Sequence, residues 1–139
     1  MIDFHFETDF ELEDSTKYSD WATRIIAAHK RKHSQIDYIF CDDTYLLNLN
    51  QKHLNHDTYT DIITFDYTEG KILAGDVFIS VDRLKENAIN FNVDFKAELL
   101  RVMAHGILHL IGYKDKTDED SVLMREKENE CINMFHVEQ

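Results

Sequence analysis

Hydrophobic residues recur along this chain with two different periods, and each change of period marks a new structural element. Apolar and polar residues alternate over positions 2–7, a pattern typical of a strand. Runs rich in β-branched and aromatic residues predict three further strands, at 35–41, 60–66 and 72–81. The segment Glu69-Gly70-Lys71 separates the last two runs and indicates a hairpin between them.

Helical periodicity separates these strands and dominates the second half of the chain. Trp21, Ile25 and Ala28 stand at helical spacing, and Asp42 can cap a helix that contains several leucines. The expected helices are 18–32, one that begins after Asp42, 82–91, 95–111 and 118–135. The resulting order, βαβαββααα, predicts an α/β (α+β) fold in which helices pack on a mixed sheet.

The chain is expected to form one domain over residues 1–139. It contains no proline, only four glycines and no repeat, so no linker divides it. No apolar run is long enough to span a membrane, and acidic residues stand where a signal peptide needs bases. Cys41 and Cys131 are expected to be buried thiols in a reducing compartment. These features together predict a cytoplasmic location.

The formal net charge of −12 argues at first against a nucleic-acid partner. Most of this charge lies at the ends of the chain. Residues 1–20 hold seven acids and one base, a net −6, and residues 115–139 hold eight acids and three bases, a net −5. Residues 21–114 hold twelve acids and eleven bases, a net −1. A narrow cationic groove in the middle of the chain therefore remains compatible with the composition.

Two histidines four residues apart, His105 and His109, stand in the apolar run expected to form the helix 95–111. Residues at this spacing share one helix face, so both imidazoles can reach one metal ion. Gly112 can end the helix and reverse the chain, which lets Asp115 return as a third ligand. Three protein ligands with an open position are typical of a catalytic zinc site. The pattern therefore predicts a zinc hydrolase.

The two histidines lie apart from the apolar stripe of this helix. At 100° per residue, they fall within about 40° of each other and share their side with Glu98. A pair of surface histidines is the alternative interpretation. Because the flanking isoleucines and leucines indicate a largely buried helix, and a buried histidine pair without a ligand is costly, the metal site is favoured.

The residue after the first histidine distinguishes this pattern from that of the zinc proteases. Their motif, H-E-x-x-H, places a general base there, whereas this chain has Gly106. The spacing H-x3-H-x2-G-x2-D otherwise follows the metzincin geometry. A zincin-like metal helix without that base favours a reaction that relies on Lewis-acid activation, such as phosphodiester hydrolysis.

Three blocks of the chain match one known family in order and in spacing. Residues 105–113 match the pattern H-G-x-L-H-L-x-G-Y, residues 60–65 are similar to T-D-V-L-S-F, and residues 75–80 are similar to G-D-I-x-I-S. In these blocks the chain resembles the YbeY family of bacterial zinc-dependent endoribonucleases, also called rRNA maturation factors. The resemblance implies a single-domain α/β fold, one Zn2+ per chain, and cleavage of single-stranded RNA in ribosomal RNA maturation and ribosome quality control.

The chain departs from the family pattern at three positions. The third family histidine falls on Asp115, which is an acceptable zinc ligand but lowers the charge of the site. Asp118 and His136 are the next candidates for that ligand. The family arginine, thought to assist catalysis, falls on Leu54, and the family's common proline falls on Tyr59.

Nearby bases are the candidates to replace the missing arginine. His56 is favoured over His53 and Lys52 as the local catalytic group, although all three also read as part of a polar loop. Lys114 and its neighbour Lys116 are expected to help at the metal end of the site. The zinc ion would then be held by His105, His109 and Asp115, with His56 and Lys114 acting on the phosphate.

Two functions of different classes follow from the sequence. The first is the zinc-dependent endoribonuclease, acting on single-stranded rRNA and in contact with ribosomal small-subunit proteins. The alternative is a ribosome-assembly RNA-binding factor in which the zinc is mainly structural, because the arginine and one histidine are absent. A metallopeptidase ranks third, since Gly106 occupies the base position.

Several other residues have open interpretations. Asp61 is read equally as a partner that orients a ligating histidine or as a structural strand-end residue, whereas Asp76 favours the structural role. Glu98 is expected to pair with Arg101 rather than with a histidine. The phenylalanines read as core residues, with base stacking as the open alternative; they are Phe91, Phe95 and Phe135.

Overall fold

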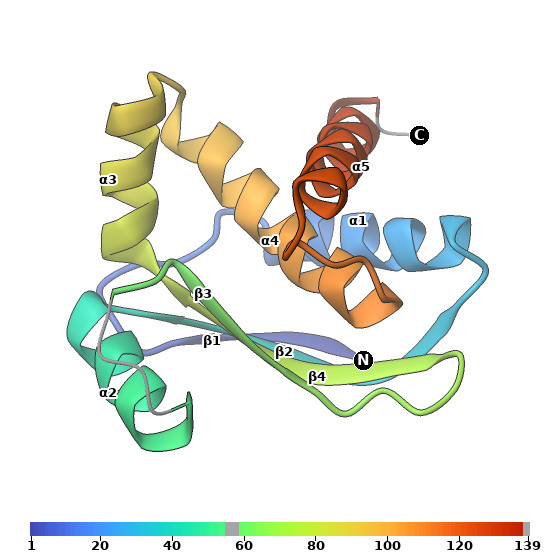
Figure 1. Ribbon diagram of the computed structural model, residues 1–139, viewed down its shortest axis with the longest axis horizontal. Coiled ribbons are helices and arrows are strands. Elements are labelled where there is room, and N and C mark those ends of the chain that lie inside the picture. The colour runs from blue at the N-terminus through green and yellow to red at the C-terminus, as the bar shows by residue number, and fades with distance from the viewer. Residues whose placement is uncertain (55–58, 138–139) are drawn as a thin grey trace.

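The centre of the molecule is a four-stranded mixed sheet, seen nearly edge-on in Figure 1. The computed structural model describes residues 1–54 and 59–137. The strands lie in the order β1-β2-β4-β3, with β1, β2 and β4 parallel and β3 antiparallel to β4. Their bounds are β1 Ile2–Phe6, β2 Lys32–Cys41, β3 Ile62–Asp66 and β4 Ile72–Ser80.

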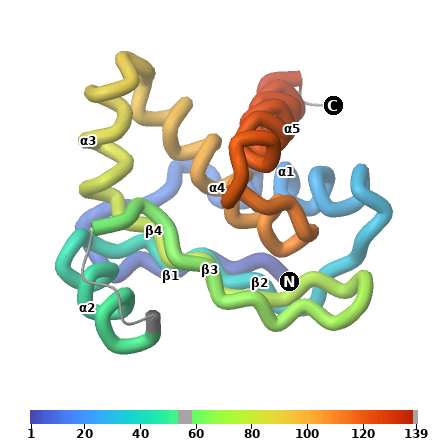
Figure 2. The backbone as a smooth tube through the Cα atoms, in the orientation of Figure 1, coloured from blue at the N-terminus to red at the C-terminus, as the bar shows by residue number. Residues whose placement is uncertain are grey.

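Five helices cover the sheet unequally. Helices α1, α3, α4 and α5 lie on one side of it, and α2 lies on the other, as the ribbon and the tube both show (Figures 1 and 2). The helices run over α1 Ser15–Ala28, α2 Asp43–Leu54, α3 Val81–Phe91, α4 Phe95–Ile111 and α5 Asp118–His136. Both faces of a sheet with parallel strands are thus covered at least in part, as such sheets require.

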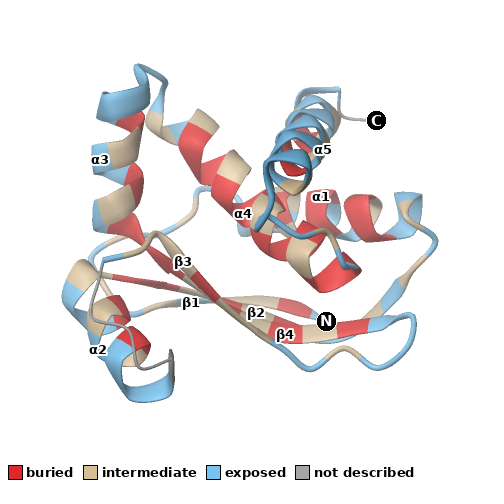
Figure 3. Cartoon of the chain, viewed as in Figure 1, coloured by how far each residue is buried: buried red, intermediate tan, exposed pale blue. Residues whose placement is uncertain are grey.

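The main core lies between the sheet and helices α1, α4 and α5 (Figure 3). Strand β2 shows why, because Ile36, Tyr38 and Phe40 alternate along it and all three are fully buried on that side. A smaller core forms under α2, where Leu46 packs with Cys41 and Ile63 on the opposite face. The second half of β2 therefore contributes buried side chains to both cores.

Helix α4 crosses the sheet at a close approach that depends on glycine. A Cβ atom at Gly106 would lie 2.8 Å from Val77 Cγ1, and one at Gly75 would lie 2.5 Å from the carbonyl oxygen of Phe65. Neither position has room for a side chain. The backbone of α4 therefore packs directly on β4, and this contact fixes where the histidines of α4 stand.

Two buried hydrogen bonds join the helices to one another and to the sheet. Trp21 Nε1 in α1 donates to the carbonyl oxygen of Cys131 in α5, at 2.7 Å. The Tyr38 hydroxyl in β2 donates to the carbonyl oxygen of Met103 in α4, at 2.8 Å. Since buried polar groups need partners, these bonds define how α4 and α5 are oriented over the sheet.

The element order and the single mixed-sheet domain predicted from the sequence are confirmed. Both cysteines are buried free thiols, as expected. The bounds of the first helix were wrong, since α1 begins at Ser15 and ends at Ala28, and Lys32 already belongs to β2. Lys30 adopts a positive φ of 59°, which ends the helical path before the expected basic last turn. Among the described residues, no helix is both long and apolar enough to cross a membrane.

Candidate metal centre

A cavity of about 620 Å³ opens between α4, α5, the end of α3 and strand β3. Residues from all four elements line it, and they come from distant parts of the sequence. From α4 come four polar side chains on one helix face: Glu98, Arg101, His105 and His109. Asp115 closes one end of the cavity, and Arg125 and Glu128 reach it from α5. The predicted metal ligands therefore lie on one shared cavity wall.

His105 stands between two carboxylates. Its Nδ1 lies 2.8 Å from Glu128 Oε2, and its Nε2 lies 3.2 Å from Asp115 Oδ2. Glu128 is 5% exposed, and an ionised carboxylate can only accept a hydrogen bond, so Nδ1 carries the proton. In the neutral ring, Nε2 then presents a lone pair toward Asp115. Two acceptors at this distance require a cation between them, either a proton or a metal ion.

The electrostatics of His105 follow from the same contacts. Burial alone lowers the pKa of a histidine, but the hydrogen bond and charge of Glu128, together with Asp115 and Asp61, outweigh this effect. The net result is a pKa of His105 above its ordinary value. The surroundings of His105 thus favour a positive charge at Nε2.

The donor set fits a zinc ion in chemistry and, at two ligands, in spacing. Zinc binds imidazole nitrogen and carboxylate oxygen at about 2.0–2.2 Å, which places two ligands of a tetrahedral ion about 3.3 Å apart. The 3.2 Å between His105 Nε2 and Asp115 Oδ2 matches this value. His109 lines the same cavity one turn further along α4. Within residues 1–54 and 59–137, however, no three His, Cys, Asp or Glu side chains already stand close enough together to hold a metal ion. The three-ligand set therefore stays a prediction.

Glu128 connects the histidine to the two arginines of the cavity. Arg101 Nη1 donates to Glu128 Oε1 at 3.2 Å, and Arg125 Nε lies 3.5 Å from the same oxygen. The Arg125 side chain is 60% exposed, whereas that of Arg101 is 20% exposed. The cavity therefore has one partly buried and one solvent-facing guanidinium beside the histidine, in a chain with a large excess of acids.

Within the described part of the chain Glu98 pairs with Arg101 rather than with a histidine, as predicted, and the ion pair is long. Arg101 Nε is 3.7 Å from Glu98 Oε1, too far for a hydrogen bond. The Glu98 residue is only 2% exposed, and among the described residues its Oε1 has no hydrogen-bond partner. Burial is the main cause that raises the pKa of this carboxyl above its usual range.

Asp61 lies where loop meets strand at the other wall of the cavity. Its Oδ2 accepts a hydrogen bond of 3.4 Å from Asn87 Nδ2, and its carbonyl oxygen accepts one from the Ser80 amide. Burial raises the pKa of Asp61, while the nearby His105 partly offsets this. Asp61 thus combines a structural role with a position on the cavity wall. Asp76 lies outside the cavity lining, where its Oδ2 accepts from the Tyr67 hydroxyl at 3.2 Å, so its role is structural.

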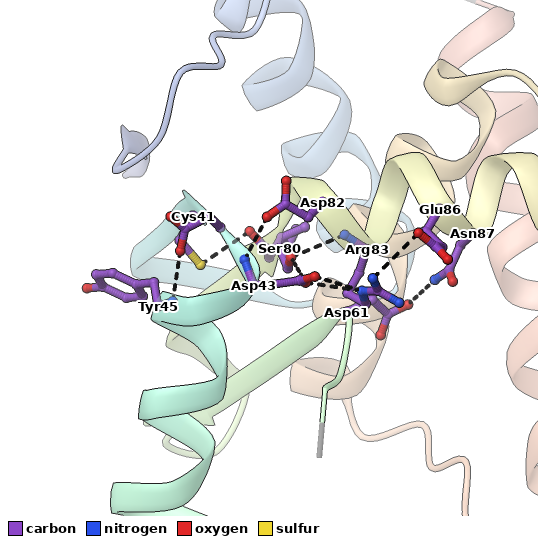
Figure 4. Close-up of polar contacts among 11 residues, drawn as sticks. Cys41, Asp43, Tyr45, Asp61, Ser80, Asp82, Arg83, Glu86 and Asn87 are labelled. Atoms are coloured by element: carbon purple, nitrogen blue, oxygen red, sulfur yellow. Dashed lines mark hydrogen bonds and ion pairs between the residues drawn. The ribbon is translucent and has the colours of Figure 1, made fainter. Parts of the chain in front are cut away.

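A polar network holds α2 and α3 against the end of β4 (Figure 4). The Ser80 hydroxyl donates to Asp43 Oδ1 at 2.7 Å, and Arg83 Nε donates to the same carboxylate at 3.1 Å. Ser80 also caps α3 by accepting from the Arg83 amide, whereas Asp82 was the expected start of this helix. This network lies behind Asp61 and Asn87 and fixes the wall of the cavity that α3 contributes.

The remaining predicted site residues that the structure describes are not among those that line the cavity. His56 lies outside the described residues. Lys114 is exposed and is not among the residues that line the cavity. The alternative third ligands are not among the residues that line it either: Asp118 lines a separate depression on α5, and the His136 ring packs on Phe135. His53 packs its ring against Phe65, with 5.9 Å between the centroids.

Sequence reasoning missed the contribution of α5. Glu128 and Arg125 belong to the acidic segment 115–139, to which the sequence assigned no site residue other than Asp115 and its alternatives Asp118 and His136. The signal that distinguishes Glu128 is its helical spacing: it lies four residues after Met124 and three before Cys131, both of which are buried. An acid on an apolar helix face needs a partner, and here the partner is His105.

Comparison with known proteins matches this chain to one family along nearly its whole length. The family described as endoribonuclease YbeY matches residues 3–136. The chain belongs to the endoribonuclease YbeY family. A YbeY relative from Flavobacterium johnsoniae is 55% identical over 139 residues and covers all of both chains. One from Flavobacterium psychrophilum is 52% identical, over 100% of this chain and 99% of its own.

A solved structure supports the fold assignment. The solution structure of a protein from Thermotoga maritima superposes with a TM-score of 0.67 at 28% sequence identity. The match covers 97% of this chain and 89% of that one. The mixed sheet with helices α1, α3, α4 and α5 on one side is thus shared beyond the close YbeY relatives.

Proposed function

We propose that this chain is a zinc-dependent endoribonuclease that cleaves single-stranded RNA in ribosomal RNA maturation and ribosome quality control. Its membership of a family whose relatives are named endoribonucleases supports the reaction class. The observation that carries the metal dependence is the placement of His105 Nε2, 3.2 Å from Asp115 Oδ2 and held from behind by Glu128. An imidazole oriented by a buried carboxylate is a recurrent arrangement in catalytic metal sites.

Three side chains would hold the ion: His105 and Asp115, which already face each other, and His109 from the next turn of α4. When bound there, zinc supplies Lewis-acid activation for attack on a phosphodiester. Glu128 has a separate task, since its hydrogen bond to Nδ1 fixes the tautomer that leaves Nε2 free to bind.

The two arginines of the cavity would bind the phosphate group of the RNA substrate. Arg101 and Arg125 line it beside His105, and both are held near the site by Glu128. A guanidinium offsets the negative charge that builds up on a phosphate during the reaction. They are candidates for the role that the family pattern gives to the arginine replaced by Leu54. They have a positional advantage over Lys114, which lies outside the cavity lining.

The shape and charge of the site favour a single strand over a duplex. Arg101 and Arg125 bring positive charge to the cavity, whereas the molecule as a whole carries −12. An unpaired nucleotide can enter such a cavity with its base turned in, whereas a duplex presents two charged backbones to an acidic surface. Contacts with ribosomal small-subunit proteins and a cytoplasmic location complete the proposal.

The alternative function is an RNA-binding assembly factor with a mainly structural zinc. The replacements at Asp115 and Leu54 favour it, because both remove positive charge from the family pattern. A peptidase is disfavoured by packing as well as by chemistry. The Cβ that a glutamate needs at position 106 would lie 2.8 Å from Val77 Cγ1.

The test is incubation of zinc-loaded protein with single-stranded RNA, with the matching duplex and with a peptide library. A His109→Ala variant purified in the same way controls for contaminating ribonuclease. Zinc-dependent cleavage of the single strand alone, lost in the variant, is the expected result. Binding of RNA without any cleavage would instead support the assembly factor.

A further inference from the structure

The cavity extends well beyond the predicted metal ligands, toward the turn between α3 and α4. At this end it is lined by Phe91, the last residue of α3, and by Glu98 in the first turn of α4. Seven residues separate Glu98 from His105, about 10 Å along the helix axis. This is comparable with the reach from a phosphate to the base of the same nucleotide. We call Phe91 and Glu98 the distal subsite.

Phe91 was expected in the core, but the structure places it on the surface with 58% of the residue exposed. The other two phenylalanines of that prediction pack in the core, where Phe135 is 2% exposed and Phe95 packs against its edge. An aromatic ring left in solvent at the mouth of a cavity loses the free energy of burial that the others gain. A base stacked on it would recover that burial.

Glu98 presents an acceptor without a donor. Its Oε1 is buried and has no hydrogen-bond partner within residues 1–54 and 59–137, and the guanidinium of Arg101 stays 3.7 Å away. A buried carboxylate in this state is costly to keep. A ligand that donates N–H groups at this position would satisfy it. The exposed ring of Phe91 and the unsatisfied oxygen of Glu98 therefore fit the same kind of ligand, a flat ring with N–H donors on its edge.

We propose that the distal subsite binds a guanine base of the RNA substrate, stacked on Phe91 and donating from its Watson–Crick edge to the Glu98 carboxylate. Guanine carries two adjacent N–H donors, at N1 and N2, which match one carboxylate. Adenine, cytosine and uracil each present a single donor group beside an acceptor, and that acceptor would face the carboxylate. The proposal rests on the proposed function, and it adds the base preference of the site.

Binding is measured first, without cleavage. Fluorescence anisotropy in chelator compares labelled oligouridine with the same oligomer carrying one guanosine, one adenosine or one cytidine. The wild type is expected to bind the guanosine oligomer about tenfold more tightly than oligouridine. Glu98→Gln should remove this preference, so that the guanosine oligomer binds no more tightly than oligouridine. Phe91→Ala should weaken binding of every oligomer about tenfold, and Phe91→Leu should not restore it.

Ile89→Ala is the matched control, because Ile89 lies on the same helix, is 79% exposed and does not line the cavity. It should bind like the wild type. Circular dichroism of each variant confirms that it is folded, and Glu98→Gln keeps the side-chain volume so that folding is retained. A wild type that binds all oligomers equally, or no oligomer at all, would overturn the proposal, as would a guanine preference that survives in Glu98→Gln.

Cleavage is mapped separately with zinc-loaded protein on a mixed-sequence single strand. Cuts that cluster beside guanosines in the wild type and lose this clustering in Glu98→Gln support the subsite. Guanine-selective binding without any cleavage would leave the subsite standing and reject the proposed nuclease. Cleavage with no dependence on guanine would do the reverse, so the two failures are distinguishable.

Discussion

At the scale of single residues, the site depends on how buried charges are balanced. His105 is the only group in the cavity whose ring is held on both sides, by Glu128 at Nδ1 and by Asp115 near Nε2, among the described residues. Glu98 lies on the same face of α4, about two turns before His105, and its situation is the opposite. It is a buried acid, and among the described residues its Oε1 has no hydrogen-bond partner. We therefore expect these two residues to affect the stability of the protein differently as pH changes.

Glu128→Gln should lower the pKa of His105, because the variant removes the hydrogen bond and the charge that oppose the effect of burial. In metal-free wild type, a raised pKa contributes stability that is fully present below the unfolded value of 6.5 and is lost as pH rises through the folded value. NMR titration of the imidazole and denaturant unfolding measure the two effects. Zinc affinity should fall about 10- to 100-fold.

Glu130→Gln is the control for this substitution. Glu130 is two residues further along α5, and its side chain is 61% exposed and paired with Lys127. It should leave the His105 titration unchanged. An unaltered pKa of His105 in Glu128→Gln would contradict the role assigned to Glu128.

Glu98→Gln should stabilise the protein at neutral pH but not in acid. Burial raises the pKa of the Glu98 carboxyl above its ordinary value of 4.5, so this group ionises at lower pH in the unfolded chain than in the folded one. The wild type therefore loses stability between the unfolded and folded pKa values, and the loss persists above them. Urea unfolding across this pH range should show that the free energy of unfolding of the variant, relative to that of the wild type, increases as pH rises. The same gain in the exposed control Glu126→Gln would contradict this account.

The sequence singled out His105, His109 and Asp115, which the structure brings to one cavity, but it did not single out Glu128. His105 and His109 stand out because imidazoles are rare in an apolar helix. Glu128 could not be assigned in the same way, because its partner lies 23 residues away and the contact depends on how α5 docks on α4. Phe91 was misread as core, since an aromatic residue at a helix end gives no sign of whether a neighbouring element covers it.

At the scale of elements, the position of α4 on the sheet decides the geometry of the site. Gly106 lies between the two histidines, and its Cα faces Val77 on β4. The helix ends at Gly112, whose φ of 125° reverses the chain toward Asp115. The prediction from the sequence that Gly112 terminates this helix is confirmed, because any side chain is strained at that φ.

Gly106→Ala should destabilise the fold by about 1–3 kcal/mol through overpacking, despite the better helix propensity of alanine. The added methyl group meets Val77 Cγ1 at 2.8 Å and Ile62 Cδ1 at 3.4 Å. Thermal and denaturant unfolding measure the loss. In the double variant with Val77→Ala, the two substitutions should be less destabilising together than the sum of the single effects. Strict additivity would show that the close approach is absent.

Most helices and strands could be predicted from local sequence patterns. The features that depend on contacts between distant residues could not. The helix 95–111 was predicted with its observed bounds, because its apolar stripe and its terminal glycine are both local. The start of α3 was placed one residue late, since the capping group, Ser80, ends an apolar strand and reads as part of it. The sequence predicted a mixed sheet but not the strand order β1-β2-β4-β3, because that order depends on contacts between strands far apart in the chain.

At the scale of the whole molecule, an acidic protein offers RNA only a small cationic area. The net charge of −12 lies mainly in the two ends of the chain, and Arg101 and Arg125 stand together in one cavity. Binding should therefore depend on few phosphate contacts, and long-range attraction should contribute little.

This charge distribution predicts a shallow salt dependence of RNA binding. Two arginine contacts with a single strand give a slope of log affinity against log salt concentration near about −1.4. Arg125→Gln should reduce the slope by about 0.7, and Lys85→Gln, on the exposed side of α3, should not change it. Anisotropy titrations in chelator over a range of salt concentrations measure the slopes. A wild-type slope steeper than about −4 would show that many more basic groups than these two arginines contact the RNA.

The most direct test of the whole account is the zinc content of protein purified without an affinity tag and dialysed against zinc. Elemental analysis should find about one zinc ion per chain in the wild type, and much less than one in each of His105→Ala, His109→Ala and Asp115→Ala. Lys114→Ala, next to Asp115 but outside the cavity lining, should keep the full content. A folded wild type that retains no zinc, or an Asp115→Ala variant that retains all of it, would contradict the proposed metal centre.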